Sequence, residues 1–404
     1  MNTSKVILSA VLFSLLAVPL AHAQTYREEG IRIGAQEFKD MKGVRIGSAR
    51  LKAGVSTEGQ YDSNIFLTSS DKKHDYISIT SPEFLLDLPL GLDERHLVQF
   101  MYKADAAAFS DYKSQNYVNQ DAAANVNLRL PFGYFNINND YKNTSDRANS
   151  DFTDLVRRKE NRAETILGIE ANKLTYEVGY AELIKRYYKE AYQTLEYNEQ
   201  DYTGTVFYQL MPKTKALVEY QHGAIDYSKD AGRDGYFDQE MIGLRGQLTG
   251  KTVGLIKGGY QKRIYTKGSA AGYESFVAEA GIISTLSSRT EVTAKVRRNA
   301  VESVYSTNNY YNANTAIVSL TQKLINRWTF LGSSRFDLNE YPDAVAGLDK
   351  ARRDAIITEN VALRYDMKSW AKATLGYQYK EDISNVDTLK YTDNLFSLRC
   401  DLLM

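Results

Sequence analysis

The sequence contains few of the residues that cross-link a chain, kink it or bind metals. Its 404 residues include 1 Cys, 6 Pro and 4 His. Because a disulfide needs two thiols, Cys400 cannot form one within the chain. Lys plus Arg equals Asp plus Glu, at 50 each, so neither sign of charge is in excess. This balance argues against a nucleic-acid partner, for which a basic surface is expected.

Long apolar runs are also absent after the first 20 residues, and the mean hydropathy is −0.43. A spanning helix needs roughly 18 apolar residues, so a chain of this kind can cross a membrane only as strands. The one apolar run follows Lys5 and precedes Ala21-His22-Ala23. We therefore expect residues 1–23 to be a cleaved signal peptide and residues 24–44 to be a periplasmic N-terminal extension. A buried N-terminal helix is the alternative for the apolar run.

Apolar and polar residues alternate through most of the remaining sequence. In "NVNLRLPFGYFNIN", residues 125–138, the alternation continues on both sides of Pro131-Phe132-Gly133. A period of two broken by a Pro/Gly turn indicates a β-hairpin. Short turns recur about every 40 residues, and longer polar stretches separate them, a spacing that suits two membrane strands and one long loop per repeat.

This pattern predicts an all-β fold, a transmembrane antiparallel up-and-down β-barrel spanning residues 45–404. We expect about 18 strands, short periplasmic turns, long extracellular loops and both chain ends on the short-turn side. A soluble sandwich or a secreted solenoid shows similar alternation. Strands of roughly 10 residues, the unequal rims and aromatic residues at strand ends favour the barrel. The aromatic residues expected in the two interfacial girdles are Tyr102, Tyr141, Tyr180, Tyr260, Tyr341, Tyr365, Trp328 and Trp370.

A barrel of this size is wide enough to hold water, so its polar face is expected to line a lumen. Charges of both signs fall on that face without a ring of one sign, which indicates a pathway for a polar solute without strong ion selectivity. The alternative is that these charges only pair across strands. The lumen-lining candidates are Arg129, Glu170, Glu219, Arg245, Lys257, Glu291, Lys295, Arg297, Lys323, Arg335, Asp337, Arg364 and Lys372.

The first predicted hairpin carries the most specific motif. "GVSTEGQYDSNIFLT" (residues 54–68) ends in Tyr-Asp-x-Asn-Ile-Phe, and "SITSPEFLLDLPLG" (residues 78–91) opens a second strand with Ser-Pro. This hairpin resembles β-barrel porins of the bacterial outer membrane that are found with exopolysaccharide biosynthesis and export genes. The short polar residues of the motif also suit a turn that shapes the first outer loop. The matching positions are Tyr61, Asp62, Asn64, Ile65, Phe66, Ser81, Pro82, Leu86 and Leu88.

The resemblance implies an outer-membrane barrel that exports a polysaccharide beside a periplasmic polysaccharide-export protein. By similarity to classical porins, whose third loop folds inward, the polar stretch 142–162 is a candidate constriction. A solvated outer loop is the alternative. The charged candidates within the stretch are Arg147, Asp154, Arg157, Arg158, Lys159 and Arg162.

Enzyme chemistry finds little support in the sequence. The three His residues after the signal peptide, His74, His96 and His222, lie on separate segments, which argues against a Ser/His/Asp site or a three-ligand metal site. We predict no enzyme activity, cofactor or metal. We expect a porin-like conduit for secretion of an exopolysaccharide. An uptake porin for small solutes and a non-transporting structural or adhesion barrel are the alternatives. The expected partners are outer-membrane lipid and either a polysaccharide or another polar solute.

Overall fold

The computed structural model describes residues 43–91, 96–147, 151–152, 154–249, 251–266, 272–305, 308–344 and 350–404. The predicted signal peptide and residues 24–42 of the predicted extension lie outside these ranges. Val44 begins a short strand, β1, that pairs with β2. No helix in the described part of the chain is long and apolar enough to span a membrane.

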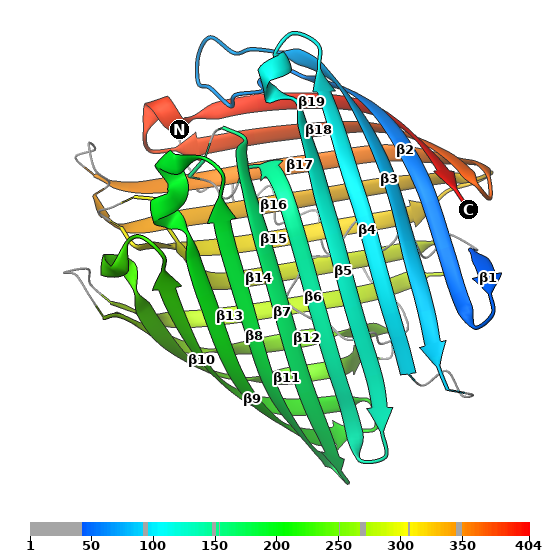
Figure 1. The fold of residues 1–404 in the computed structure, drawn as a ribbon, viewed down its shortest axis with the longest axis vertical. Helices are drawn as coiled ribbons and strands as arrows, with labels where there is room; N and C mark the ends of the chain where they lie inside the picture. Colours follow the sequence, from blue (N-terminus) through cyan, green and yellow to red (C-terminus); the bar gives the residue numbers. More distant parts are fainter. Residues whose placement is uncertain are drawn as a thin grey trace.

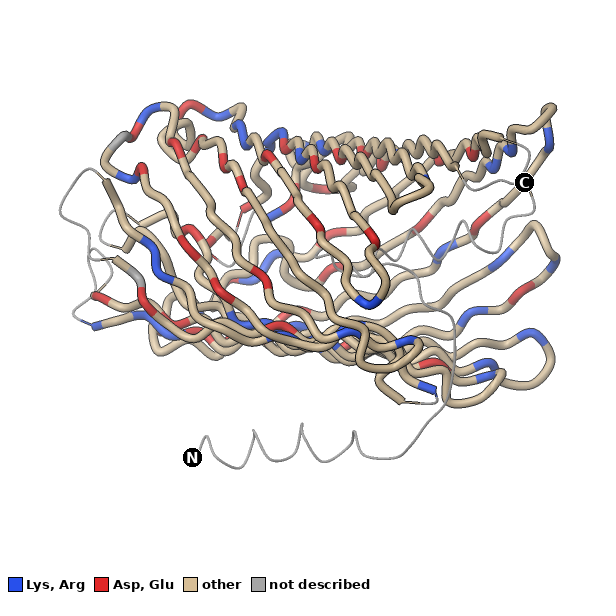
Figure 2. The backbone as a smooth tube through the Cα atoms, turned by 90° about the horizontal axis from the view of Figure 1, so that it is seen from below, with Lys and Arg blue, Asp and Glu red and all other residues tan. Residues whose placement is uncertain are grey.

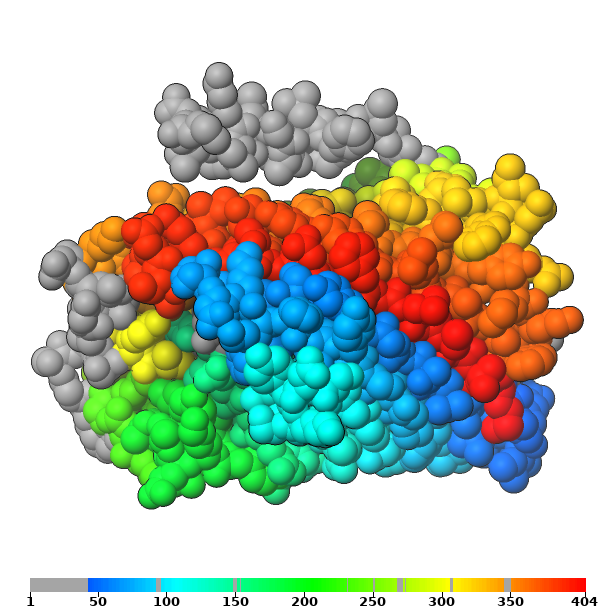
Figure 3. Space-filling view, turned by 90° about the horizontal axis from the view of Figure 1, so that it is seen from above, coloured from blue at the N-terminus to red at the C-terminus, as the bar shows by residue number. Residues whose placement is uncertain are grey.

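Antiparallel strands close into a barrel, as the alternation predicted. Each strand from β2 to β19 pairs with the next, which gives 18 barrel strands in the described residues. The ring closes where β19 returns to β2, with Leu398 opposite Gly59. Figure 3 shows this closure as the red C-terminal strand lying along the blue N-terminal one. The strand bounds are β1 Val44–Ile46, β2 Ala49–Asp62, β3 Asp75–Leu90, β4 His96–Phe109, β5 Tyr117–Leu130, β6 Gly133–Asp146, β7 Val156–Ala171, β8 Leu174–Tyr187, β9 Tyr197–Met211, β10 Thr214–Tyr227, β11 Gly235–Thr249, β12 Thr252–Tyr265, β13 Tyr273–Ser287, β14 Thr290–Glu302, β15 Tyr310–Lys323, β16 Trp328–Ala344, β17 Ala351–Lys368, β18 Ala371–Ser384 and β19 Tyr391–Leu403.

The two rims differ as predicted. One rim consists of tight turns, such as Asn172-Lys173, where Asn172 has a φ of +55°, a conformation that Asn tolerates. The other rim carries longer connections with short 3₁₀ turns, seen as coiled ribbons in Figure 1 at the end away from β1 and the C-terminus. The 3₁₀ turns are η1 Lys113–Gln115, η2 Glu190–Leu195, η3 Ala231–Arg233 and η4 Asp387–Leu389.

The strands are longer than the roughly 10 residues expected from the sequence. They contain between 13 and 18 residues, apart from β1. Their outer ends continue the ladder through polar segments, because polar side chains do not interrupt backbone pairing above the membrane. Asp146 is opposite Val156, so the polar stretch 142–162 is mostly strand and its loop spans only residues 147–155.

Register and exposure identify the outer face of the wall. Residues directly opposite in an antiparallel ladder share a face. Val218 and Ile242 form one such pair and are 62% and 69% exposed, whereas Leu217 on the other face is buried. Side chains on the concave face of a barrel converge and bury one another, so the exposed apolar face points to lipid. The predicted girdle position of Tyr341 is wrong, because Tyr341 lies on the inner face and is buried.

Candidate functional site: the lumen and its outer mouth

The inner face of the wall is charged and cross-linked. Register places all 13 predicted lumen-lining residues on this face. Figure 2 shows positive and negative residues interspersed along the strands. Several candidates pair with opposite charges: Arg129 with Glu170 at 2.5 Å, Lys257 with Glu219 at 2.8 Å and Glu279 at 3.7 Å, Arg335 with Asp337 at 2.5 Å, and Arg364 with Asp366 at 3.3 Å.

These pairs give the wall a fixed polar surface. Lys257 lies between carboxylates from β10 and β13, so three charges from three strands form one cluster. Paired charges of both signs hydrate the lumen without setting a strong preference for ions of one sign. The wall as a whole is therefore suited to a polar solute.

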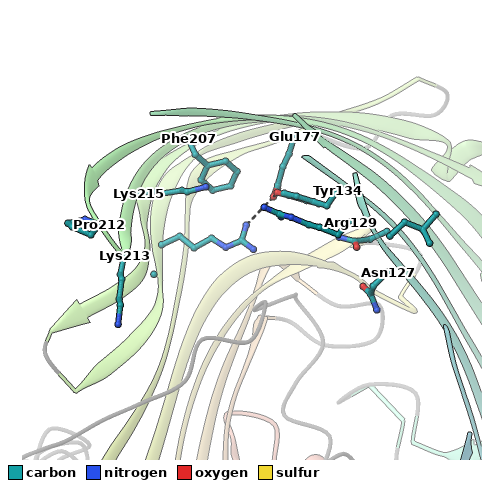
Figure 4. Close-up of a pocket in the computed structure, with 12 residues that line it drawn as sticks. Asn127, Arg129, Tyr134, Glu177, Phe207, Pro212, Lys213 and Lys215 are labelled. Carbon is teal, nitrogen blue, oxygen red and sulfur yellow. Dashed lines mark hydrogen bonds and ion pairs between the residues drawn. The ribbon is translucent and has the colours of Figure 1, made fainter. Parts of the chain in front are cut away.

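Near the short-turn rim, the inner wall contains a basic recess of about 420 Å³. Figure 4 shows Arg129, Tyr134, Phe207 and Lys215 around one hollow, from β5, β6, β9 and β10. Four of its lining residues are cationic, whereas one is acidic. The lining residues are Asn127, Leu128, Arg129, Tyr134, Asn136, Glu177, Phe207, Pro212, Lys213, Lys215, Arg245 and Gly246.

At the opposite end, Asp151 of the third outer loop (residues 147–155) contacts the far side of the barrel mouth. The Asp151 Oδ1 atom lies 3.4 Å from Arg352 Nη1 of β17, and Tyr341 of β16 donates its hydroxyl hydrogen to the same carboxylate. The loop follows β6, and β16 is nine strands from β7, half of the 18-strand ring. The contact therefore joins opposite sides of the mouth.

A second outer loop completes the surroundings of Asp151. The Val304 backbone N–H, from the connection between β14 and β15, donates to Asp151 Oδ2 at 3.1 Å. The side chains of Asp151 and Arg352 are 0% and 2% exposed. Burial raises the pKa of Asp151, against the opposing influence of the Tyr341 and Val304 hydrogen bonds and the Arg352 charge. We name this arrangement, Asp151 with Val304, Tyr341 and Arg352, the mouth latch.

The third outer loop has two further anchors beside the latch. Arg147 Nη2 donates to the Ile65 carbonyl oxygen at 2.8 Å, which connects the third loop to the first. Phe152 packs in a buried cluster with Val156 and Tyr187, against which Val304 also packs. Polar and apolar contacts together hold the loop over the mouth.

The six candidate constriction residues lie in three places: the third outer loop, the inner face of β7 and the outer face of β7. Arg147 and Asp154 lie in the loop, but the others belong to β7 because that strand begins at Val156. Arg158 and Arg162 face inward and pair with carboxylates, Arg158 with Glu160 at 2.5 Å and Arg162 with Asp201 at 3.5 Å. The expectation that Arg157 and Lys159 lie in a constriction loop is wrong.

Arg157 and Lys159 face outward, and both cations lie over the Tyr188 ring. Alternation follows once β7 is known to begin at Val156, because neighbouring residues of a strand point to opposite faces, and Arg157 and Lys159 then lie on the face opposite Arg158. The sequence offered no comparable signal for the mouth latch, in which Asp151 is more than 150 residues from each of its three partners.

The motif of the first hairpin forms the first outer loop. Asp62 Oδ1 accepts the Asn64 backbone N–H at 2.8 Å, an Asx turn. Asn64 is completely buried, and its Nδ2 donates to the carbonyl oxygens of Thr68 at 2.9 Å and Thr392 at 3.0 Å. Around this turn, Phe66 packs edge-on against Tyr112. Tyr61 packs on Tyr76, and Pro82 lies on the outer face of β3.

His74, His96 and His222 lie on separate segments, and no group of three His, Cys, Asp or Glu in the described ranges could hold a metal ion. The closed wall and polar lumen define a transmembrane β-barrel channel. More particularly, the family described as "Putative beta-barrel porin 2" matches residues 39–402, so the chain belongs to that family. It is an outer-membrane β-barrel with a porin-like channel.

No curated protein matches the chain. Among solved structures, Pseudomonas aeruginosa OpdK with vanillate is similar at 10% identity and a TM-score of 0.49, over 88% of this chain and 99% of that one. Pseudomonas aeruginosa OpdL is similar at 12% identity and a TM-score of 0.46, over 89% and 100%. Acinetobacter baumannii OccAB3 is similar at 8% identity and a TM-score of 0.48, over 89% and 100%. Similarity at this level carries no inference about the solute.

Proposed function

We propose that this barrel admits small polar solutes through an outer mouth that its third loop constricts. The mouth latch carries the proposal, because it connects the third loop to the opposite wall at 3.4 Å and buries both charged partners. A segment fixed across the mouth reduces the width available to a solute. The charged inner face supplies the hydrated path.

A size series of neutral sugars tests this proposal. The purified protein is placed in liposomes, and swelling is measured with mono-, di- and larger oligosaccharides. The wild-type barrel is expected to admit the smallest sugars and exclude the larger ones. Asp151→Ala is expected to raise the size limit because it removes the contact across the mouth. Asp154→Asn is the matched control, since Asp154 is an exposed acid in the same loop.

Wild-type liposomes that admit large oligosaccharides as well as small ones would contradict the proposed constriction. No swelling with any sugar, in wild type and variant alike, would favour the structural or adhesion barrel.

An exopolysaccharide conduit is the second candidate function. The resemblance of the Tyr61, Asp62, Asn64, Phe66 and Pro82 motif to porins of exopolysaccharide operons supports it, and a periplasmic polysaccharide-export protein would then be the partner. Deletion of the gene in its host tests this candidate. Loss of surface polymer with periplasmic accumulation supports polymer export, and unchanged surface polymer contradicts it.

A further inference from the structure

We propose that the basic recess near the short-turn rim is a binding site for small organic carboxylates that pass through the channel. The proposal rests on the proposed function and specifies its solute class.

Cations outnumber carboxylates in and around the recess. Arg129, Lys213, Lys215 and Arg245 line it, whereas Glu177 is its acidic member. Glu170 lies beside the recess and pairs with Arg129 at 2.5 Å. Two of the four cations are thus matched by carboxylates, Arg129 by Glu170 and Arg245 by Glu177, and the other two leave the recess positive.

Lys213 and Lys215 have no carboxylate partner among the described residues. Lys215 Nζ donates to the neutral Thr175 hydroxyl at 2.8 Å. Lys213 lies in the exposed turn between β9 and β10, without a side-chain partner in the described ranges. An ammonium group carries three donors, so Lys215 has donors left for an anion.

Arg245 is held in place with part of its guanidinium still available. Its Nη1 lies 3.4 Å from Glu177 Oε1, and Tyr134 donates its hydroxyl hydrogen to that same oxygen. The guanidinium carbon lies 5.3 Å from the centre of the Phe207 ring. A guanidinium carries five donors in a plane, and the Glu177 contact uses one of them.

Apolar groups line the recess beside these cations. Phe207 and Pro212 contribute to the lining, and Lys215 Nζ lies 5.8 Å from the centre of the Phe207 ring. The volume of about 420 Å³ falls within the range of small-molecule sites, roughly 300–1,000 Å³. A recess with two available cations and an apolar side fits an anionic head on a compact apolar body. A bare inorganic anion would leave the apolar side unfilled.

Equilibrium binding to the detergent-solubilised protein tests the proposal without requiring an open channel. The probe is 4-fluorobenzoate, whose ¹⁹F line broadens on binding, with unlabelled benzoate, benzyl alcohol and inorganic phosphate as competitors. Saturable broadening is expected, with displacement by benzoate and none by benzyl alcohol. Lys215→Gln combined with Arg245→Gln is expected to weaken binding at least tenfold, because each charge-assisted hydrogen bond contributes substantially.

Lys213→Gln gives a second test that does not depend on the folding of the double variant, because Lys213 is exposed in a turn. It is expected to weaken binding severalfold. The matched control is Lys323→Gln, which removes one inner-face cation at the end of β15, outside the recess. Three results would overturn the carboxylate assignment: broadening of the ¹⁹F line that does not saturate, equal affinity of 4-fluorobenzoate for all variants, or stronger displacement by phosphate than by benzoate. A liposome-swelling result that contradicts the constricted mouth would not change the binding measured in detergent. The two experiments therefore test the proposed function and the carboxylate site separately.

Discussion

Two buried polar residues hold the outer loops through hydrogen bonds that apolar residues cannot make. Asn64 bonds backbone groups of its own loop and of β19, and Asp151 connects the third loop to the opposite wall. Removal of a buried partner leaves its donors and acceptors unsatisfied, which costs about 1–3 kcal/mol for each such group. Individual polar side chains therefore decide where these loops lie.

Asn64→Ala is expected to destabilise the barrel by about 2–4 kcal/mol, because it removes several buried hydrogen bonds at once. The free energy of unfolding is measured by urea denaturation in lipid vesicles. Ser70→Ala is the matched control, since Ser70 is exposed in the same loop. Equal stability of the two variants would show that Asn64 does not hold the loop.

The raised pKa of Asp151 predicts that current through the channel depends on pH. Burial favours the protonated acid in the latched state, so the latch is most stable below the ordinary Asp pKa. It weakens as pH rises through the raised value. Current is therefore expected to increase with pH above about 4. Channel current is recorded from roughly pH 4 to pH 8, and Asp151→Asn is expected to abolish this dependence. A current that falls with pH, or an unchanged profile in the variant, contradicts the prediction.

At the scale of elements, alternation determines which side chain meets lipid. The sequence was sufficient to place Arg129, Lys295 and Lys372 on the inner face, because a period of two is a local property. It was insufficient to place Arg157 in a strand or in a loop. A polar strand above the membrane and a polar loop have the same composition, and only pairing across to β6 and β8 separates them.

Val218→Lys is expected to cost about 2–4 kcal/mol if the residue lies near the bilayer midplane, because it exposes an ammonium to lipid. Thr203→Lys, which introduces Lys on the inner face of the neighbouring strand, is expected to cost less, because its ammonium group stays in the hydrated lumen. Unfolding in vesicles measures both. A larger loss of unfolding free energy for Thr203→Lys than for Val218→Lys would contradict the assignment of Val218 to the lipid face and Thr203 to the inner face.

At the scale of the whole molecule, the barrel depends on closure between its first and last strands. The regular spacing of the short turns predicted the number of strands, because each hairpin forms between residues that are close in the sequence. The mouth latch and the pairing of β19 with β2 join residues that are more than 150 positions apart. The period of two and the turn residues carry no information about such contacts.

The closing register can be tested with the one native thiol. Thr57 lies opposite Cys400 in the ladder, and opposite residues have Cα atoms about 4.5–5.5 Å apart, within disulfide range. Thr57→Cys is expected to form a disulfide with Cys400 on oxidation, giving a cross-linked chain with altered mobility in a denaturing gel. Val55→Cys, opposite Leu402, is the control and is expected to cross-link poorly because diagonal neighbours are about 7–8 Å apart. The reverse order of cross-linking would show a different register.

Single-channel conductance in a planar bilayer is the most direct test of the constricted mouth. The wild-type barrel is expected to conduct a small current, and Asp151→Ala is expected to increase it severalfold, whereas Asp154→Asn leaves it unchanged. A wild-type current as large as that of Asp151→Ala would contradict a third loop that narrows the path.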